Sequence, residues 1–249
     1  MSVRIAIPEP TSADLAYNQR SLTPYLVALH AADALPVVIP LHERQDRVAK
    51  LLSSVQGILL PGSRYDVDPQ RYGAERIPEC GESDPARTAA DELLLQDAFN
   101  LHKPILGICA GMQSLNVWCN GTLIQDLKTE INHQPGRDVA EAHPVRLAGG
   151  SRLARLLPVG EPVQPMVNSS HHQAVRMPGD NLVVSAASPV DRVIEAVELD
   201  SSDHFVLAVQ WHPERTYMES AFSRAIFAAF IRAAEAWQPR RIEESVAHA

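Results

Sequence analysis

The first half of the chain alternates between short apolar runs and helical segments, and this alternation restricts the fold more than any other feature. Four apolar runs have the length of buried strands: residues 3–8, 36–40, 57–61 and 105–108. Three segments between them have helical periodicity: residues 22–32, 47–54 and 88–101. Strands separated by helices of this length form βαβ crossovers, which build a parallel sheet. The pattern therefore predicts an α/β fold with helices on both faces of the sheet.

The second half of the chain has short strand candidates with little helix between them: Val145 and residues 163–167, 182–186, 193–197 and 205–209. We expect antiparallel additions to the sheet edge there, followed by a closing helix at residues 218–237. The chain has no internal repeat or linker, so residues 1–249 are predicted to form a single domain, with residues 238–249 as a frayed polar tail. The predicted architecture is a three-layer sandwich with a mixed, mostly parallel central sheet.

Composition excludes several classes of partner. The chain has 22 basic and 30 acidic residues, a net charge of −8, and no basic run interleaved with aromatic residues, so nucleic acid is not an expected partner. No apolar stretch has the ~18 residues of a membrane span, and the N-terminus lacks the apolar core of a signal peptide. Three cysteines without a C-x-x-C pair indicate a reducing compartment. We therefore expect a cytoplasmic protein without membrane contact.

Residues 104–113, PILGICAGMQ, are an apolar run that stops at Cys109 and turns into a helical pattern. Gly107 and Gly111 flank the cysteine and leave room for a sharp strand-to-helix turn. This is the spacing of a nucleophile elbow, with sulfur in place of a serine oxygen. The N-terminus of the following helix favours a thiolate, because its unpaired N–H groups carry partial positive charge. The alternative interpretation is a small buried hydrophobic residue, since free cysteine is often fully buried.

A base for this sulfur is available in residues 208–214, AVQWHPE, where a strand ends at a His-Pro-Glu triplet. Pro213 keeps His212 extended, and in extended chain the side chains at i and i+2 project to the same side. Glu214 is thus placed to accept a hydrogen bond from one ring nitrogen of His212, which leaves the other nitrogen for the sulfur. Taken alone, the triplet is also compatible with a surface turn.

A third segment, GILLPGS at residues 57–63, ends a strand at a glycine. Glycine lets a backbone approach a ligand closely. The N–H of Gly62 and that of Ala110, the residue after the nucleophile, could form an oxyanion hole. The alternative is an ordinary turn at the end of a strand, which glycine and proline often supply.

Together these segments resemble the class I glutamine amidotransferases, whose domain is flavodoxin-like. More narrowly, the chain is similar to the γ-glutamyl hydrolases of peptidase family C26, which include γ-glutamyl-γ-aminobutyrate hydrolase. The resemblance covers nearly the whole chain and rests on five ordered segments: LPGSRYDVDPQRYG (60–73), GICAGMQSLN (107–116), GTLIQDL (121–127), VNSSHHQAV (167–175) and IEAVE (194–198). It implies a catalytic triad of Cys109, His212 and Glu214, with Gly62 and Ala110 as oxyanion donors. It also implies a glutamyl pocket lined by Gln113, Asn168, Ser169, His171 and Gln173.

The chain departs from the family pattern at three places. Ala110 stands where C26 hydrolases commonly have arginine, which puts a leaving-group contact in doubt but keeps the backbone N–H. Asn120 replaces a second glycine before the Gly-Thr-Leu triplet. Asp191 and Arg192 replace an Asp-Gly turn. None of these changes touches the expected chemistry directly.

The resemblance implies a cofactor-free hydrolysis in which Cys109 attacks a γ-glutamyl amide and forms a γ-glutamyl thioester. The expected partner is a small γ-glutamyl substrate, and a homodimer is an open alternative. We expect the long loop at residues 62–87 to hold the leaving amine through six side chains: Arg64, Tyr65, Asp66, Arg71, Tyr72 and Arg87. Two other functions stay open, namely a glutaminase subunit that supplies ammonia to a separate synthetase, and a non-catalytic thiol sensor.

The remaining cysteines and histidines do not indicate a second reactive thiol or a metal site. Cys80 and Cys119 lack a charged setting that would activate a thiol. The ten histidines include the pair His171 and His172, but the chain has no H-E-x-x-H motif and no Cys/His spacing typical of a metal site. The sequence therefore predicts no metal.

Overall fold

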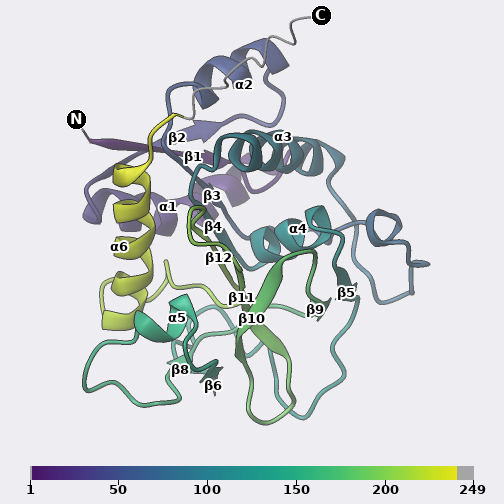
Figure 1. The fold of residues 1–249 in the computed structure, drawn as a ribbon. Helices are drawn as coiled ribbons and strands as arrows, with labels where there is room; N and C mark the ends of the chain where they lie inside the picture. The colour runs from purple at the N-terminus through teal and green to yellow at the C-terminus, as the bar shows by residue number, and fades with distance from the viewer. Residues whose placement is uncertain (1, 240–249) are drawn as a thin grey trace, which may run out of the picture.

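One mixed sheet runs through the part of the chain that the computed structural model describes, residues 2–239. Five parallel strands form one side of this sheet (Figure 1). Their spatial order is β2 (Ala34–Ile39), β1 (Val3–Pro8), β3 (Gly57–Leu60), β4 (Ile105–Ile108) and β12 (Val206–Val209). This is the 2-1-3-4-5 order of flavodoxin-like folds. The predicted parallel sheet is confirmed.

The other side of the sheet is antiparallel, as the second half of the sequence predicts. The sheet continues from β12 through β11 (Ile194–Leu199), β10 (Leu182–Ala187) and β7 (Arg146–Leu147). Two strands that the sequence analysis did not predict, β5 (Thr122–Ile124) and β9 (Ala174–Met177), join it through β11. The expected strand at residues 163–167 is reduced to β8 (Met166–Val167), which pairs with β6 (His143–Pro144) in a separate small sheet.

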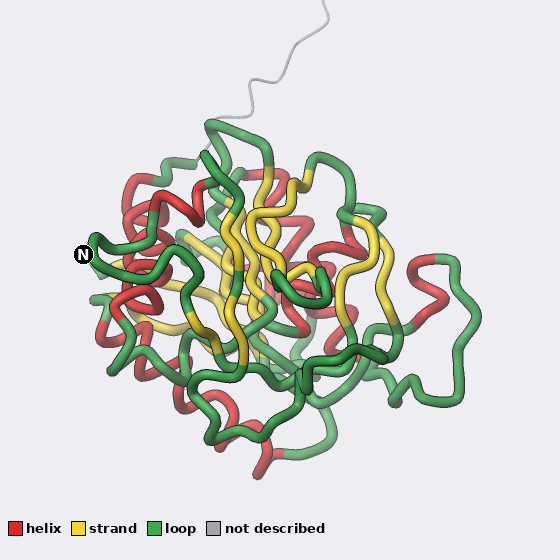
Figure 2. Tube along the Cα trace, turned by 90° about the horizontal axis from the view of Figure 1, so that it is seen from below, coloured by secondary structure: helices red, strands yellow, loops and turns green. Residues whose placement is uncertain are grey.

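Helices cover both faces of the sheet and complete the predicted three layers. One face packs against α1 (Leu15–Ala31) and α6 (Ala221–Ala236), and the other against α2 (Gln45–Leu52), α3 (Pro85–Leu101) and α4 (Ala110–Trp118). Figure 2, seen from below, shows the yellow strands running between these red helices. Two short helices, η1 (Pro69–Tyr72) and α5 (Arg152–Arg155), lie in connections. Every residue of β3, β4 and β12 is buried, which explains why these strands read as uninterrupted apolar runs.

Capping side chains decide where the helices begin. α1 starts at Leu15, seven residues before the predicted start, because the Asp14 carboxylate accepts the N–H of Tyr17 and caps a polar first turn. α3 begins at Pro85 under a cap by Asp84. α6 begins at Ala221, capped by Ser220, rather than at residue 218. Apolar periodicity alone does not detect such starts.

Two further predictions concern the C-terminal tail and membrane-spanning helices. The sequence predicts a frayed tail at residues 238–249. Residues 240–249 of this tail lie outside the part of the chain that the structure describes. Over the described range, none of the helices has the length and apolar character needed to cross a bilayer.

Candidate active site

Cys109 occupies the turn between β4 and α4, at the N-cap position of that helix. Its backbone has φ 54° and ψ −111°, a strained conformation for a residue with a side chain. Its N–H donates to the carbonyl of Val209 on β12 at 2.9 Å. The cysteine is 5% exposed. The backbone thus has the strained strand-to-helix turn of a nucleophile elbow.

Gly111 is required by the close approach of α4 to the end of β3. A Cβ atom at this position would lie 2.1 Å from the carbonyl oxygen of Leu60. Backbone cannot yield to such an overlap as a flexible side chain can. The glycine therefore sets how near the helix that follows Cys109 can pack against the neighbouring strand.

We expect Gly111→Ala to lower the free energy of unfolding by about 3 kcal/mol or more, because the new methyl group forces α4 away from β3. Urea denaturation of the purified variant measures this change. Gly149→Ala is the matched control, since a Cβ there has open space within 4 Å; its effect should stay within about 0.5 kcal/mol. Equal stability of the two variants would contradict the packing argument.

His212 lies beside Cys109 because β4 and β12 are parallel neighbours. Gly107 pairs with Ala208 and Ile108 with Val209, so the segments that follow both strands leave the sheet at the same edge. A Cβ at Gly62 would lie 3.0 Å from Cε1 of His212 and 3.5 Å from the Cβ of Cys109, so the two side chains are neighbours. Two residues on, Glu214 Oε1 accepts the Nδ1–H of His212 at 2.8 Å. All three side chains are buried.

Burial and neighbouring charges shift the pKa values of Cys109 and His212 in opposite directions, and the effect of the charges is larger. Burial lowers the pKa of His212, but Glu214 and the Cys109 sulfur raise it more strongly, to about 9. Burial raises the pKa of Cys109, yet the positive charge of His212 and its hydrogen bond lower it below the ordinary value. Arg215 and the Ala110 N–H add to this lowering. Both shifts move the pair towards a thiolate beside an imidazolium.

Asn168 holds the backbone of His212 from a different segment. Its Nδ2 donates to the His212 carbonyl at 2.8 Å, and its Oδ1 accepts the His212 N–H at 2.8 Å. The sequence analysis expects Asn168 to bind substrate, whereas both ends of its amide are engaged with the histidine backbone. In the structure Asn168 therefore fixes the backbone of His212.

The two expected oxyanion donors, Gly62 and Ala110, both lie near Cys109. A Cβ on Gly62 would be 3.5 Å from the Cβ of Cys109 and 3.0 Å from Cε1 of His212, so the Gly62 backbone approaches both. However, the Gly62 N–H donates to the hydroxyl of Tyr25 at 2.9 Å. The Ala110 N–H faces the Cys109 sulfur. Donation by these two N–H groups to an oxyanion stays a prediction, and the Gly62 N–H would first have to leave the Tyr25 hydroxyl.

Tyr25 is a site residue that sequence analysis missed. It lies on α1, is 1% exposed, and its hydroxyl lies 3.4 Å from Nδ1 of His212. In the sequence it fits the apolar face of the helix, and a tyrosine at a core position gives no signal of contact with a catalytic group. Only the packing of α1 against the sheet shows it.

The other expected glutamyl-pocket residues are buried and bonded within the protein. Gln113 Nε2 donates to the carbonyl of Gln173 at 3.1 Å and to Oε1 of Gln210 at 3.2 Å. Ser169 donates to the carbonyl of His133, and Gln173 Nε2 donates to the carbonyl of Gln125. His171 is also buried, away from solvent. The structure brings this set together near the triad, and contact of these side chains with substrate stays a prediction.

The sequence analysis expects the loop at residues 62–87 to hold the leaving amine, and the structure differs from this expectation in part. Arg87 does not belong to it, because α3 begins at Pro85, and its guanidinium binds Asp91 and the carbonyls of Pro10 and Pro61. Arg71 pairs with Glu92. The buried Arg87 is thus engaged within the protein, whereas contact of the exposed Arg71 with a leaving amine stays a prediction.

The outer part of the loop is better placed to meet a ligand. Arg64 is half-exposed, pairs with the Asp14 carboxylate at 3.1 Å and lies over the rings of Tyr17 and Tyr65. A cavity of about 20 Å³ beside Ala110 is lined from this loop by Ser63 and Tyr65, among others. Such a volume holds about one water molecule. A glutamyl group is too large for this cavity.

The two other cysteines have raised thiol pKa values. Burial, with Asp66 nearby, raises the pKa of Cys80, and burial raises that of Cys119 to about 12. All three cysteines are free thiols. Cys109 is thus the cysteine whose environment favours a thiolate.

The fold and this elbow define a class I glutamine amidotransferase-like domain. Among solved structures, the glutaminase domain of a Trypanosoma brucei CTPS with bound acivicin aligns with 95% of this chain and 97% of its own, at 18% identity and a TM-score of 0.54. A Thermoplasma acidophilum protein, described as a candidate component of GMP synthase, matches 94% of this chain and 95% of its own, at 15% identity and a TM-score of 0.63. At these identities, the likeness concerns the fold.

The chain belongs to the peptidase C26 family, whose model matches residues 7–214. A Mycobacterium tuberculosis protein described as a candidate glutamine amidotransferase is 39% identical over 87% of this chain and 68% of its own length. The γ-glutamyl-γ-aminobutyrate hydrolase of Escherichia coli is 34% identical over 85% of each chain. The family membership and the hydrolase relatives agree with the resemblance seen in the sequence.

Proposed function

We propose that this protein is a cysteine-dependent hydrolase of small γ-glutamyl amides, such as γ-glutamyl amines or γ-glutamyl amino acids. The observation that carries the proposal is the buried Cys109–His212–Glu214 arrangement at the carboxyl ends of two neighbouring parallel strands. The matched C26 family and the γ-glutamyl-γ-aminobutyrate hydrolase relatives support it.

The first half of the reaction forms a thioester. The Cys109 thiolate attacks the carbonyl carbon of the γ-glutamyl amide, and the oxygen becomes an oxyanion that the Ala110 N–H stabilises. The Gly62 N–H joins it after leaving the Tyr25 hydroxyl. His212 then gives its proton to the departing nitrogen, the C–N bond breaks, and a neutral amine leaves.

The second half releases glutamate. Neutral His212 removes a proton from water while the oxygen attacks the thioester carbonyl. The C–S bond then breaks, and the sulfur leaves as the thiolate, so the thiolate–imidazolium pair is restored. Glu214 stays ionised throughout and stabilises the charged form of the imidazole.

We propose that the loop between Gly62 and Asp84 governs access to the sulfur. Ser63 and Tyr65 of this loop line the small cavity beside Ala110. Opening of the loop would admit substrate, and closure afterwards would exclude water until the amine has left. Arg64 and Tyr65 are the exposed polar group and the half-buried aromatic group that follow Gly62 most closely in this loop. They are the residues we expect nearest to the leaving amine.

The deciding experiment is turnover by the purified chain without any partner. We expect release of glutamate from γ-glutamyl-γ-aminobutyrate or another γ-glutamyl amine, at a kcat/KM at least about tenfold above that for free glutamine. Coupled glutamate detection measures it, and Cys109→Ala is the blank. If the chain alone cleaves none of them but an added synthetase switches on glutaminase activity, the proposal fails in favour of an ammonia-supplying subunit.

A further inference from the structure

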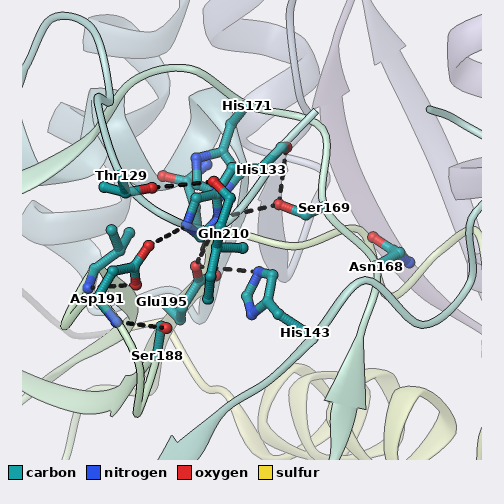
Figure 3. Close-up of polar contacts among 12 residues, drawn as sticks. Thr129, His133, His143, Asn168, Ser169, His171, Ser188, Asp191, Glu195 and Gln210 are labelled. Atoms are coloured by element: carbon teal, nitrogen blue, oxygen red, sulfur yellow. Dashed lines mark hydrogen bonds and ion pairs between the residues drawn. The ribbon is translucent and has the colours of Figure 1, made fainter. Parts of the chain in front are cut away.

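Four buried polar side chains from separate parts of the chain meet next to the site: His133, His143, His171 and Glu195. They are 4%, 2%, 4% and 0% exposed, respectively. Figure 3 shows the three rings grouped around the carboxylate. One nitrogen of each histidine and one carboxylate oxygen lie within 4.8 Å of one another. Such a concentration of titratable groups in a protein interior needs a physical explanation.

The spacing of these atoms fits a metal ion. Oε1 of Glu195 lies 3.5 Å from Nδ1 of His133, 3.5 Å from Nε2 of His143 and 3.7 Å from Nε2 of His171. Zinc bonds of about 2.1 Å in a tetrahedron place neighbouring ligand atoms about 3.4 Å apart. The three distances from Glu195 are close to this value, whereas the separations between ring nitrogens, which reach up to 4.8 Å, would shorten when an ion binds.

The outward nitrogen of each ring is already hydrogen-bonded to an acceptor. His133 Nε2 lies 2.9 Å from the Asp191 carboxylate, and His171 Nδ1 lies 2.9 Å from the carbonyl of Gln173. His143 Nδ1 lies 3.2 Å from the carbonyl of Pro144. A carboxylate or carbonyl oxygen can only accept, so each of these nitrogens carries the proton. In a neutral ring the inward nitrogen then presents a lone pair, as metal-ligating histidines do.

The cluster does not satisfy itself by hydrogen bonding. Nε2 of His143, Nε2 of His171 and both carboxylate oxygens of Glu195 have no hydrogen-bond partner among the described residues. Ser169 Oγ lies 3.3 Å from Nδ1 of His133, but this hydroxyl donates to the His133 carbonyl. One proton on Glu195 could serve one nitrogen and would leave the others unpaired. Unpaired buried polar atoms are costly, and a bound cation would pair all four groups.

We propose that His133, His143, His171 and Glu195 bind one divalent transition-metal ion, with Zn²⁺ as the ion that this donor set favours. Imidazole nitrogens and a carboxylate are ordinary zinc ligands, and four protein ligands make a closed tetrahedral site, which is typical of structural zinc. The sequence analysis expects no metal because these ligands are 10, 28 and 24 residues apart and match no known spacing. Only the fold brings them together.

The ion would join segments that otherwise have little regular structure. His133 lies in the connection from β5 to β6, His143 on β6, and His171 between β8 and β9, whereas Glu195 lies on β11 in the main sheet. The carbonyl of Glu195 accepts the N–H of Gln210, two residues before His212. The metal would therefore anchor the loops beside the triad and position them, without taking part in the reaction.

Metal binding by the untagged full-length chain tests the proposal. The protein is freed of metal by dialysis against a chelator and titrated with ZnCl₂, and bound zinc is measured by inductively coupled plasma mass spectrometry. We expect one Zn²⁺ per chain and a higher melting temperature for the loaded protein, since a ligand that binds only the folded state stabilises it. Less than stoichiometric uptake by the folded wild type, with an unchanged melting temperature, would overturn the proposal.

Variants locate the site. Glu195→Gln and His143→Gln should lose stoichiometric zinc. Asp191→Asn removes the charge of the carboxylate that His133 contacts and keeps an oxygen for the Val193 N–H, so it should weaken binding by about 10- to 100-fold. His204→Gln is the matched control, because His204 is a buried histidine that bonds to the Lys103 carbonyl outside the cluster. Retained zinc in Glu195→Gln and His143→Gln would overturn the assignment. Should both fail to fold, by circular dichroism, the affinity of Asp191→Asn decides. These readouts do not depend on hydrolase activity, so they stand apart from the proposed function.

Discussion

Replacing Cys109 with alanine should abolish hydrolysis, with kcat falling by about 10⁵-fold or more, because removal of a nucleophile in a triad leaves only binding and oxyanion stabilisation. The variant should also form no γ-glutamyl thioester, whereas rapid acid quenching of the wild type should give an adduct visible by mass spectrometry. Fold is expected to be retained, since alanine fits the space of the cysteine and adopts its positive φ at similar cost.

Cys80→Ala and Cys119→Ala are the controls for this experiment. Both residues are buried thiols like Cys109, but their pKa values are raised rather than lowered. We expect each to keep kcat within a few-fold of the wild type. Turnover of Cys109→Ala near the wild-type rate, or loss of the thioester in Cys80→Ala, would show that the nucleophile has been assigned wrongly.

Replacing Glu214 with glutamine should lower kcat by about 10²- to 10⁴-fold, less than the loss of the nucleophile. The carboxylate accepts the Nδ1–H of His212 at 2.8 Å and raises the pKa of that ring. Glutamine keeps the shape but removes the charge, so the imidazolium loses its main support. Steady-state kinetics with the best γ-glutamyl amide measures the change.

The pH profile of activity distinguishes an electrostatic effect of Glu214 on His212 from a merely structural role of Glu214. In the wild type, activity should rise with pH as the thiolate of Cys109 forms and fall above about 9 as His212 loses its proton. Glu214→Gln removes a charge that raises the pKa of His212, so the falling limb should move to lower pH. Glu219→Gln, an exposed glutamate five residues on, is the control and should change neither limb. An unmoved profile in Glu214→Gln would mean that another group orients the histidine.

The parallel half of the sheet and the elbow were predictable because they depend on short windows of sequence. Buried strands such as β3 and β4 are continuous apolar runs, and the turn at Cys109 needs small residues at fixed offsets, where Gly107 and Gly111 stand. Helix starts were less predictable, as at Leu15, because a capping side chain outweighs apolar periodicity. The short strands β5 and β9 were missed, since two or three residues of pairing leave no periodic signal.

The sequence by itself determined the local chemistry: a cysteine at a strand-to-helix turn, and a histidine and a glutamate two positions apart in extended chain. The tertiary structure decided which groups meet. The parallel register of β4 and β12 brings Cys109 and His212 together across 103 residues, and the packing of α1 adds Tyr25. It also gathers the histidines around Glu195 from four segments. Local backbone preferences are encoded in neighbouring residues, whereas contacts between distant segments depend on strand order and register, which no short stretch of sequence contains.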